Sequence, residues 1–328
     1  MGNKVVLDPE VSGITSKELY NFHSVFRSYF LVIDCRSEEE YLLSHVDMSI
    51  HHSNKLQNPC CNSYLKEVSK FDAIIMYGYL DNTQNSVLHR TCNNILQVKK
   101  HNCLSSLKVL KLNDGYDIYH SLYPFHCSDY PGYQHGMLFP SHIEDRVYLC
   151  GGGIATNIDV VRALKITHIV NCTVDYPFVD EIPTDAATRK IELTGHIERL
   201  RIPVVDDRDS RIQDYFPAAV AFIDTALLLS PANVVLVHCK HGQSRSATIL
   251  AAWLMATTVL PTSMACNHGM NSVEIRTGGQ SISPPPPPSP VQAVAYLRSC
   301  RSVVRPNDGF LEQLEAWARR RSEYSNGQ

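Results

Sequence analysis

Short apolar runs alternate with helical segments along both halves of this 328-residue chain, and this pattern constrains the fold more than any other feature. Amphipathic segments with helix-start residues, such as Ser37 followed by three glutamates, lie between the apolar runs. Alternation of this kind is typical of α/β folds, in which helices cover a largely parallel central sheet. The strand-like runs occupy 30–34, 71–79, 106–112, 147–150, 167–173, 199–206 and 234–237.

The chain is long enough for two domains. A segment containing Pro, Gly and His at 130–139 is predicted to be the linker between a first domain at 1–129 and a second at 140–323. Within the second domain, 261–290 is a low-complexity insertion rich in Ser, Gly and Pro, which we expect to be disordered. Because loop-closure entropy grows slowly with length, this insertion should leave the rest of the domain intact.

The composition argues against several classes of protein. The 44% hydrophobic and 19% charged residues are typical of a folded chain, and a net charge of −3 provides no basic field for nucleic acid. No apolar run reaches 18 residues, so we expect no membrane span. The first residues, MGNKVVLD, lack the regions of a secretory signal, and Val6 stands where a myristoylation signal needs Ser or Thr.

The cysteine pattern indicates a reducing compartment. Eleven cysteines are an odd number, and no two have the spacing of a zinc site or a dithiol motif. A secreted disulfide framework would have an even number, so we expect free thiols in the cytoplasm or the nucleus. We expect no metal and no other cofactor.

The stretch VVLVHCKHGQSRSAT at 234–248 carries the strongest chemical signal. A loop that leads from a strand into a helix aims its backbone N–H groups at one point, and Gly242 allows the tight turn. Arg245 adds a planar donor for two phosphoryl oxygens, and the positive field should lower the pKa of the Cys239 thiol. A thiolate that faces a phosphate-binding loop is a nucleophile for phosphoester cleavage through a cysteinyl-phosphate.

Other residues of this stretch have two interpretations each. Ser246 could hydrogen-bond the departing thiolate, or it could be an ordinary hydroxyl at a helix start. Lys240 and His241 could meet an anionic substrate or simply be solvated. His238 should orient the loop, and metal ligation is not expected because it has no partner ligands. The loop residues predicted to bind phosphate are Lys240, His241, Gly242, Gln243, Ser244 and Arg245.

Phosphoester cleavage also needs a general acid that protonates the leaving oxygen. The segment RIPVVDDRDSRI offers Asp206, Asp207 and Asp209 directly after a strand. Each of them could instead be a solvated loop acid or a capping residue. The residue pattern alone leaves the choice among the three open.

Residues 140–323 resemble the catalytic domain of dual-specificity protein phosphatases, and the order of the motifs resembles the mitogen-activated protein kinase phosphatase subgroup. The matching segments are VYLCGGGIATNIDVVRALKITHIVNCT, IPVVDD, YFPAAVAFID, VHCKHGQSRSAT, AAWLM and RPNDGFLEQL. The resemblance implies that Asp206, which follows Ile-Pro and two further residues, is the general acid. It also implies that Asn307 supports the phosphate-binding loop.

Residues 12–128 resemble a rhodanese-like domain through LVIDCRSEEEYLLSHV and VLKLNDGYDIYHSLYPFHCSD. A sulfur-transferring rhodanese would have a cysteine directly after the second strand, where MYGYLDN has none. The resemblance therefore implies a domain for docking or regulation. In the kinase phosphatases, docking uses a basic cluster, but HHSNKLQNPCCNSYLKEVSK contains only isolated lysines.

The leading interpretation is a metal-free phosphatase for phosphotyrosine and phosphoserine/threonine in proteins, with mitogen-activated protein kinases as the implied substrates. One alternative is a pseudophosphatase that only binds phosphorylated partners. Another is a phosphatase for RNA 5′-triphosphate or a phosphoinositide.

The insertion contains a run of five prolines between two Ser-Pro pairs, Ser283-Pro284 and Ser289-Pro290. It is a spacer, a target of a proline-directed kinase, or a ligand for an SH3- or WW-type partner at 284–290.

Overall fold

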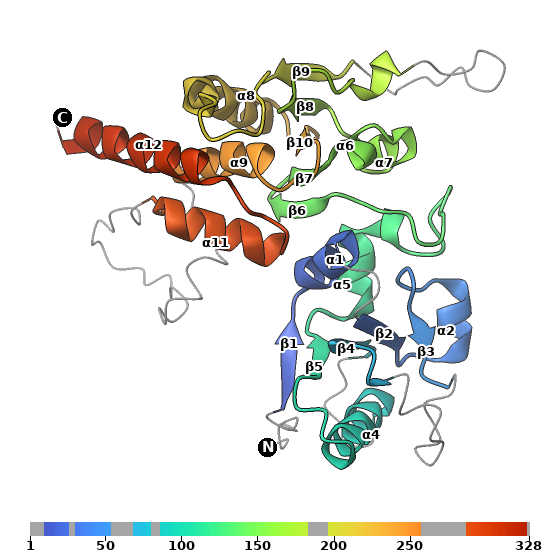
Figure 1. Cartoon of the computed structure of the whole chain (residues 1–328). Coiled ribbons are helices and arrows are strands. Elements are labelled where there is room, and N and C mark those ends of the chain that lie inside the picture. Colours follow the sequence, from blue (N-terminus) through green and yellow to red (C-terminus); the bar gives the residue numbers. More distant parts are fainter. Residues whose placement is uncertain are drawn as a thin grey trace, which may run out of the picture. The chain divides into compact units, whose positions relative to one another are not determined.

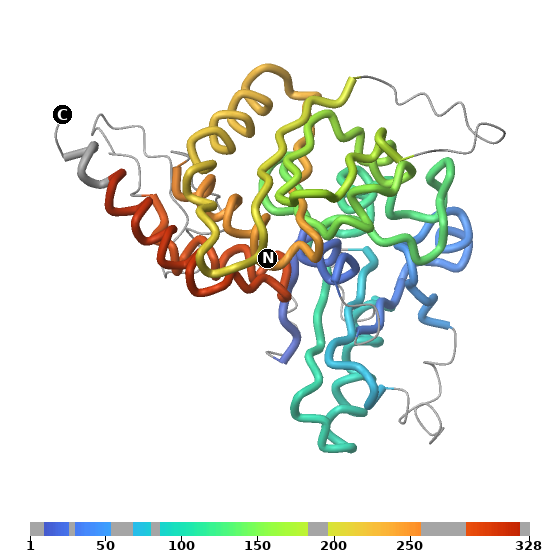
Figure 2. Tube along the Cα trace, turned by 45° about the horizontal axis from the view of Figure 1, so that its top comes forward, coloured from blue at the N-terminus to red at the C-terminus, as the bar shows by residue number. Residues whose placement is uncertain are grey.

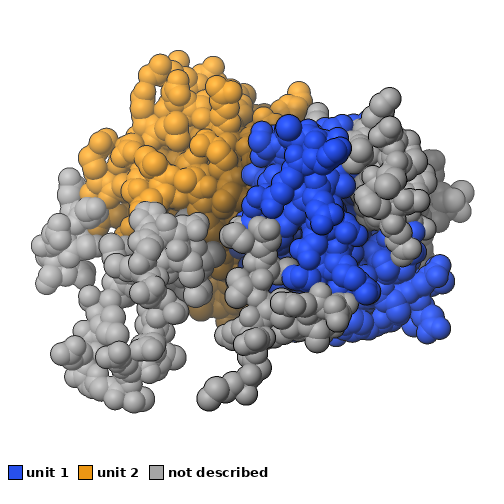
Figure 3. All heavy atoms as spheres, turned by 90° about the horizontal axis from the view of Figure 1, so that it is seen from below, with its two compact units in different colours: residues 1–138 blue, residues 139–328 orange. Residues whose placement is uncertain are grey.

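The alternating strands and helices form two separate five-stranded sheets. The structure is a computed structural model, and it describes residues 10–25, 30–53, 68–79, 86–182, 196–256 and 287–326. Residues 1–138 form one compact unit and residues 139–328 form a second one, coloured blue and orange in Figure 3.

All the strand pairs of unit 1 are parallel, in the order β1-β5-β4-β2-β3. The predicted strands and helices are present, whereas β1, α1 and the two-residue β3 were not predicted because their sequences are short and partly polar. The elements in chain order are β1 (Val11–Ile14), α1 (Ser16–Val25), β2 (Phe30–Asp34), α2 (Glu38–Leu43), β3 (Ile50–His51), β4 (Ala73–Tyr77), α4 (Val87–His101), β5 (Lys108–Leu112) and α5 (Gly115–Leu122).

The central strand β4 is buried along its whole length, because helices cover both faces of the sheet. Ile74 and Met76 belong to an apolar cluster with residues of α4, such as Ile95. Side chains alternate between faces along a strand, so Tyr77 points to the other face, where its ring stacks on Tyr116 of α5. This double coverage explains why β4 is a continuous apolar run.

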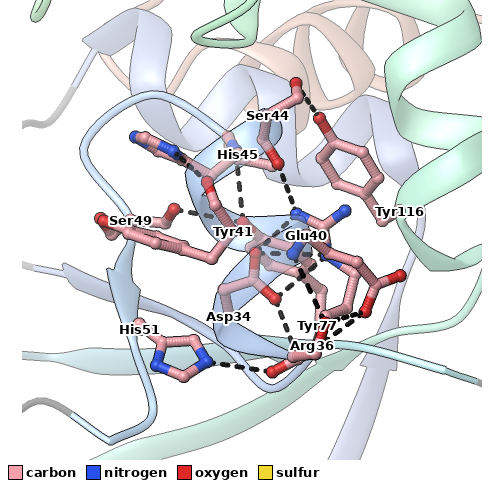
Figure 4. Close-up of polar contacts among 12 residues, drawn as sticks. Asp34, Arg36, Glu40, Tyr41, Ser44, His45, Ser49, His51, Tyr77 and Tyr116 are labelled. Carbon is pink, nitrogen blue, oxygen red and sulfur yellow. Dashed lines mark hydrogen bonds and ion pairs between the residues drawn. The ribbon is translucent and has the colours of Figure 1, made fainter.

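A buried ion pair joins the end of β2 to the neighbouring segments of unit 1, as Figure 4 shows. The Arg36 guanidinium donates to Asp34 Oδ2 at 2.6 Å and to the Ser44 carbonyl oxygen at 2.6 Å, and it lies 3.5 Å from the centre of the Tyr116 ring. Burial opposes the charge of Arg36, but the hydrogen bond and charge of Asp34 outweigh burial and raise the pKa of Arg36. Arg36 therefore keeps its positive charge, and its contacts fix the turn after β2.

The prediction of a linker at 130–139 needs a correction, because its residues up to 138 fold onto unit 1. The buried Asp47 carboxylate accepts hydrogen bonds from Tyr133 Oη at 2.6 Å and from the Gly136 backbone N–H at 3.0 Å. His135 Nδ1 lies 3.2 Å from the same carboxylate. A buried carboxylate needs such donors, and here the segment that resembled a linker supplies them.

The sheet of unit 2 has the order β6-β7-β10-β8-β9, with only β6 antiparallel to its neighbour. The antiparallel strand β6 was not predicted, since its residues follow directly on the Gly- and Pro-containing segment. The strands are β6 (Ser141–Glu144), β7 (Val147–Gly151), β8 (His168–Asn171), β9 (Glu198–Arg201) and β10 (Val235–Cys239). The helices are α6 (Gly152–Ala155), α7 (Ile158–Ala163), α8 (Phe216–Leu229), α9 (Arg245–Ala256), α11 (Pro290–Cys300) and α12 (Asp308–Asn326).

Helix α9 is the centre of unit 2, and its residues 245–255 are all buried. Helices α8, α11 and α12 pack around it, as the two views in Figures 1 and 2 show. Among the described residues, one helical segment, Ile212–Leu229, has the length and hydropathy of a membrane span. Its residues Phe216, Ala219 and Ile223 are fully buried in the core of this unit.

The predicted insertion at 261–290 lies outside the described residues up to 286, and its end needs a correction. Pro290 is the first residue of α11, and Ser289 is its N-cap. The Ser289 hydroxyl accepts from the Gln292 N–H, and the Gln292 side chain accepts from the Ser289 N–H. This capping box starts the helix where the sequence continued to resemble low-complexity chain.

Candidate active site

The carboxyl end of β10, the central strand of unit 2, leads through the 239–245 loop into α9. Cys239 is the last residue of β10, pairs in register with Gly151 of β7 and is 1% exposed. The carboxyl ends of parallel strands are where α/β proteins bind ligands. The sheet therefore presents the cysteine sulfur at the usual position for a binding site.

Only glycine fits at position 242 of the 239–245 loop. Gly242 has φ +67°, a conformation that side chains of L-residues rarely adopt. A Cβ atom there would also lie 2.4 Å from the carbonyl carbon and oxygen of Cys150. The loop thus packs against β7 with no room for a side chain.

The carbonyl groups of the 239–245 loop are bound from outside, which leaves its N–H groups directed inward. The oxygen of Lys240 accepts from the Gly152 N–H at 3.2 Å, and that of Gln243 accepts from the Arg305 N–H at 2.8 Å. The oxygens of His241 and Gly242 accept from the guanidinium of Arg301, at 3.2 and 2.8 Å. Amides that point toward one centre form an anion-binding site.

Cys239 is the group at that centre. Its sulfur accepts from the Gly242 N–H at 3.2 Å and from Ser246 Oγ at 3.1 Å. Burial acts to raise the pKa of Cys239, but the Ser246 hydroxyl and the amides of Ser246, Gln243 and His241 outweigh it and lower the pKa. The thiolate is therefore stabilised in a buried site.

Arg245, the last residue of the loop, has a buried Nε donor. Its Nη1 donates to the Val204 carbonyl oxygen at 3.2 Å, which fixes the guanidinium. Its Nε lies 3.6 Å from Asp206 Oδ2 and has no hydrogen-bond partner in the described part of the chain. Since buried donors are almost always paired, this one fits an oxygen of a bound anion.

Of the three candidate aspartates, the structure places Asp206 against the loop. Asp206 Oδ1 accepts from Ser244 Oγ at 2.6 Å and from Asn307 Nδ2 at 3.0 Å. The Asn307 backbone N–H also donates to Ser244 Oγ, at 3.3 Å, so Asn307 connects the acid to the loop. Asp207 instead accepts from the Asp209 N–H at 2.8 Å, which is a local turn contact.

The remaining predicted residues have more peripheral positions. Lys240, His241 and Gln243 are exposed, and their backbone groups rather than their side chains make the contacts within the loop. His238 is buried, and burial together with the charge of Arg201 lowers its pKa to about 4, so the ring is neutral at physiological pH. In the part of the chain that the structure describes, no group of His, Cys, Asp or Glu has the arrangement of a metal site.

Sequence reasoning missed Arg301, which contacts the loop from α11. Three arginines, at 298, 301 and 305, lie close together in this part of the sequence. Their pattern resembles the basic end of an ordinary helix. Only the tertiary structure distinguishes Arg301, which is 7% exposed, from its neighbours.

A thiolate at the end of a central strand, surrounded by amides and an arginine, defines a cysteine-dependent phosphatase. Comparisons with known proteins agree. The family of the dual specificity phosphatase catalytic domain matches residues 147–280. Dual specificity protein phosphatase 1 of Arabidopsis thaliana is 31% identical over 176 residues, which are 54% of this chain and 67% of that protein.

A further relative and a solved structure are also similar to this chain. Dual specificity protein phosphatase 18 of Pongo abelii is 28% identical over 174 residues, which are 53% of this chain and 70% of that protein. The crystal structure of the Yvh1 phosphatase domain from Chaetomium thermophilum is 27% identical, with a TM-score of 0.41, and covers 56% of this chain and 96% of that domain.

This chain belongs to the dual specificity phosphatase family. The predictions of an α/β phosphatase domain with a mostly parallel sheet and of a dual-specificity phosphatase that acts on phosphoproteins are confirmed.

Proposed function

We propose that Cys239, Arg245, Asp206 and Ser246 carry out the hydrolysis of protein phosphoesters in two steps. In the first step, Cys239 Sγ attacks phosphorus, the bond to the leaving oxygen breaks, and protonated Asp206 donates a proton to that oxygen. In the second step, water attacks the cysteinyl-phosphate, Asp206 accepts a proton, and the S–P bond breaks. The Ser246 hydroxyl stabilises the departing thiolate, and the loop amides with Arg245 hold the phosphoryl oxygens.

One observation carries this proposal. The Cys239 sulfur accepts from the Gly242 N–H at 3.2 Å and from the Ser246 hydroxyl at 3.1 Å, and Arg245 Nε, which has no hydrogen-bond partner among the described residues, belongs to the same loop. A structural cysteine in an apolar core would have a raised pKa, as Cys150 does at about 12 through burial. The contrast between two buried thiols in adjacent strands supports a nucleophilic role for Cys239.

The test compares three variants in the hydrolysis of p-nitrophenyl phosphate. Cys239→Ser should abolish turnover, because a hydroxyl is a far weaker nucleophile. Asp206→Asn should lower kcat by about 10²–10⁴-fold, as expected for loss of a general acid. Asp207→Asn is the matched control and should retain activity, since Asp207 contacts only the local turn. Equal losses in the two aspartate variants would contradict the assignment of Asp206.

We also propose that unit 1 is a rhodanese-like domain that docks or regulates rather than catalyses, as in the mitogen-activated protein kinase phosphatases. The all-parallel sheet of unit 1 and the Asp34–Arg36 pair within LVIDCRSEEEY support this proposal. Cys239→Ser protein should bind phosphorylated substrates without hydrolysing them. Its pull-down from cell extracts therefore tests whether mitogen-activated protein kinases are substrates. Recovery of phosphorylated mitogen-activated protein kinases that depends on residues 1–138 would support docking by unit 1.

Two smaller proposals concern partners and compartment. We propose that the proline run is a ligand for an SH3- or WW-type domain. Because Ser289 and Pro290 start α11, the residues proposed to bind such a domain are 284–288 rather than 284–290. We propose the cytoplasm or nucleus as the compartment, which the eight free cysteines among the described residues support. Binding of the full chain to isolated SH3 and WW domains, with the prolines replaced by alanine as control, tests the first proposal.

A further inference from the structure

The guanidinium of Arg301 is a buried cation that contacts the 239–245 loop through two carbonyl oxygens of that loop. Its Nε donates to the Gly242 carbonyl oxygen at 2.8 Å, and one Nη donates to that of His241 at 3.2 Å. Its other Nη lies 3.3 Å from Ser141 Oγ of β6, which is fully buried. All three nitrogens of the guanidinium are therefore used, two of them on consecutive carbonyls of the loop.

Helix α11 holds Arg301 in this position. Arg301 is the C-cap of α11, and its backbone N–H donates to the Leu297 carbonyl oxygen at 2.8 Å. One turn earlier, Tyr296 Oη donates to the Ile143 carbonyl oxygen at 2.8 Å, which attaches the same helix to β6. A cation at a helix C-terminus is also favoured by the helix dipole. The guanidinium is thus fixed before any ligand binds.

The position of Arg301 has a direct chemical consequence for the loop. A peptide unit that turns its carbonyl toward Arg301 turns the N–H of the next residue to the opposite side, where the sulfur lies. The two carbonyls that Arg301 binds belong to His241 and Gly242, so they fix the N–H groups of Gly242 and Gln243. These are two of the amides that face Cys239.

Burial opposes the charge on Arg301, and its pKa is lowered by burial although the nearby thiols of Cys150 and Cys239 act to raise it. A buried cation without a carboxylate partner is costly. Among the described residues, no carboxylate forms an ion pair with Arg301 within 4.0 Å. Its positive charge is therefore available to the loop, where an anion binds.

We propose that Arg301 is a positioning residue for phosphate transfer, which orients the amides of the 239–245 loop and stabilises the Cys239 thiolate. This inference deepens the proposed function and rests on Cys239 as the nucleophile. Arg301 does not touch the substrate. It acts through the loop, in contrast to Arg245, whose buried Nε has no hydrogen-bond partner among the described residues and is proposed to bind the phosphoryl group.

The test measures the pKa of Cys239 from the pH dependence of its alkylation by iodoacetamide, which needs no turnover. Arg301→Gln keeps hydrogen-bonding capacity but removes the charge and the two-pronged donor. We expect it to raise the pKa of Cys239 by about one unit, which slows alkylation at pH values below the pKa about tenfold. The inhibition constant of inorganic phosphate should increase by a similar factor, because fewer amides converge on the anion.

Arg298→Gln is the matched control, since Arg298 lies on the same helix and donates to the Val304 carbonyl oxygen rather than to the loop. In Arg298→Gln protein, the pKa of Cys239 should equal that of the wild type. If Arg301→Gln does not fold, Arg301→Lys is measured in the same way. It keeps the charge without the planar fork, and we expect a smaller increase of the pKa together with weaker phosphate binding.

A folded Arg301→Gln protein with the thiol pKa and phosphate affinity of Arg298→Gln would overturn the proposal. Unchanged values in Arg301→Lys would overturn it equally, if that is the only variant that folds. Failure of the proposed function has a different signature. In that case Cys239→Ser keeps its activity toward p-nitrophenyl phosphate, whatever the alkylation data show for Arg301.

Discussion

Replacement of Ser246 by alanine should change the acidity of Cys239 in a way that the structure allows us to estimate. The Ser246 hydroxyl donates to the Cys239 sulfur at 3.1 Å, and both residues are buried. Hydrogen bonds to charged groups contribute roughly 1.5–3 kcal/mol. One pKa unit corresponds to about 1.36 kcal/mol, so loss of this bond should raise the pKa of the thiol by about 1–2 units.

The direction of the pKa change follows from the form of Cys239 that the Ser246 hydroxyl stabilises. It donates to the thiolate, so Ser246→Ala destabilises the ionised form and a higher pH is needed to populate it. The acidic limb of the pH profile of kcat/KM, which reports ionisation in the free enzyme, should move to higher pH by the same amount. His238 should stay neutral near physiological pH, because burial lowers the pKa of that ring to about 4.

Two measurements check the prediction in one protein preparation. Thiolate absorbance at 240 nm gives the pKa of Cys239 directly, after subtraction of the Cys239→Ser background. Steady-state hydrolysis of p-nitrophenyl phosphate at a series of pH values gives the position of the acidic limb of kcat/KM. Thr248→Val is the matched control, because it removes a buried hydroxyl from the same helix, one that donates to the Ser244 carbonyl oxygen at 2.9 Å. The reasoning is refuted if Ser246→Ala and Thr248→Val leave the thiol pKa equally unchanged.

Two further predictions concern the loop and unit 1. Gly242→Ala should abolish hydrolysis of p-nitrophenyl phosphate, because the added methyl group would collide with β7. Gly153→Ala, with open space around the new Cβ and no positive φ, should retain activity. Asp34→Ala leaves Arg36 buried without its carboxylate and should lower the free energy of unfolding around β2 by about 3–5 kcal/mol, measured by amide hydrogen exchange. Glu10→Ala removes an exposed carboxylate that pairs with Lys99 and Lys100, and it should change the free energy of unfolding by less than about 1 kcal/mol.

The sequence could predict most strands and helices because their signals are local. The apolar runs of β2, β4 and β10 and the helix-start pattern at Ser37 each extend over a few residues. The strands that were missed, β1, β3 and β6, are short, and their partners supply the hydrogen bonds that make them strands. The 130–139 segment was misread because its composition gives no sign that Asp47 binds it.

The amino-acid sequence by itself determined the chemistry of this phosphatase. Strand, Cys239, Gly242, Arg245 and helix follow one another within a dozen residues, so their local geometry follows from backbone preferences alone. The tertiary structure decided which distant groups complete the site. Asp206 and Asn307 meet at Ser244, and Arg301 binds the loop carbonyls, across separations of 38 to 101 positions in the chain. Such contacts depend on how α11 and the loops around the sheet pack, and no local pattern encodes that packing.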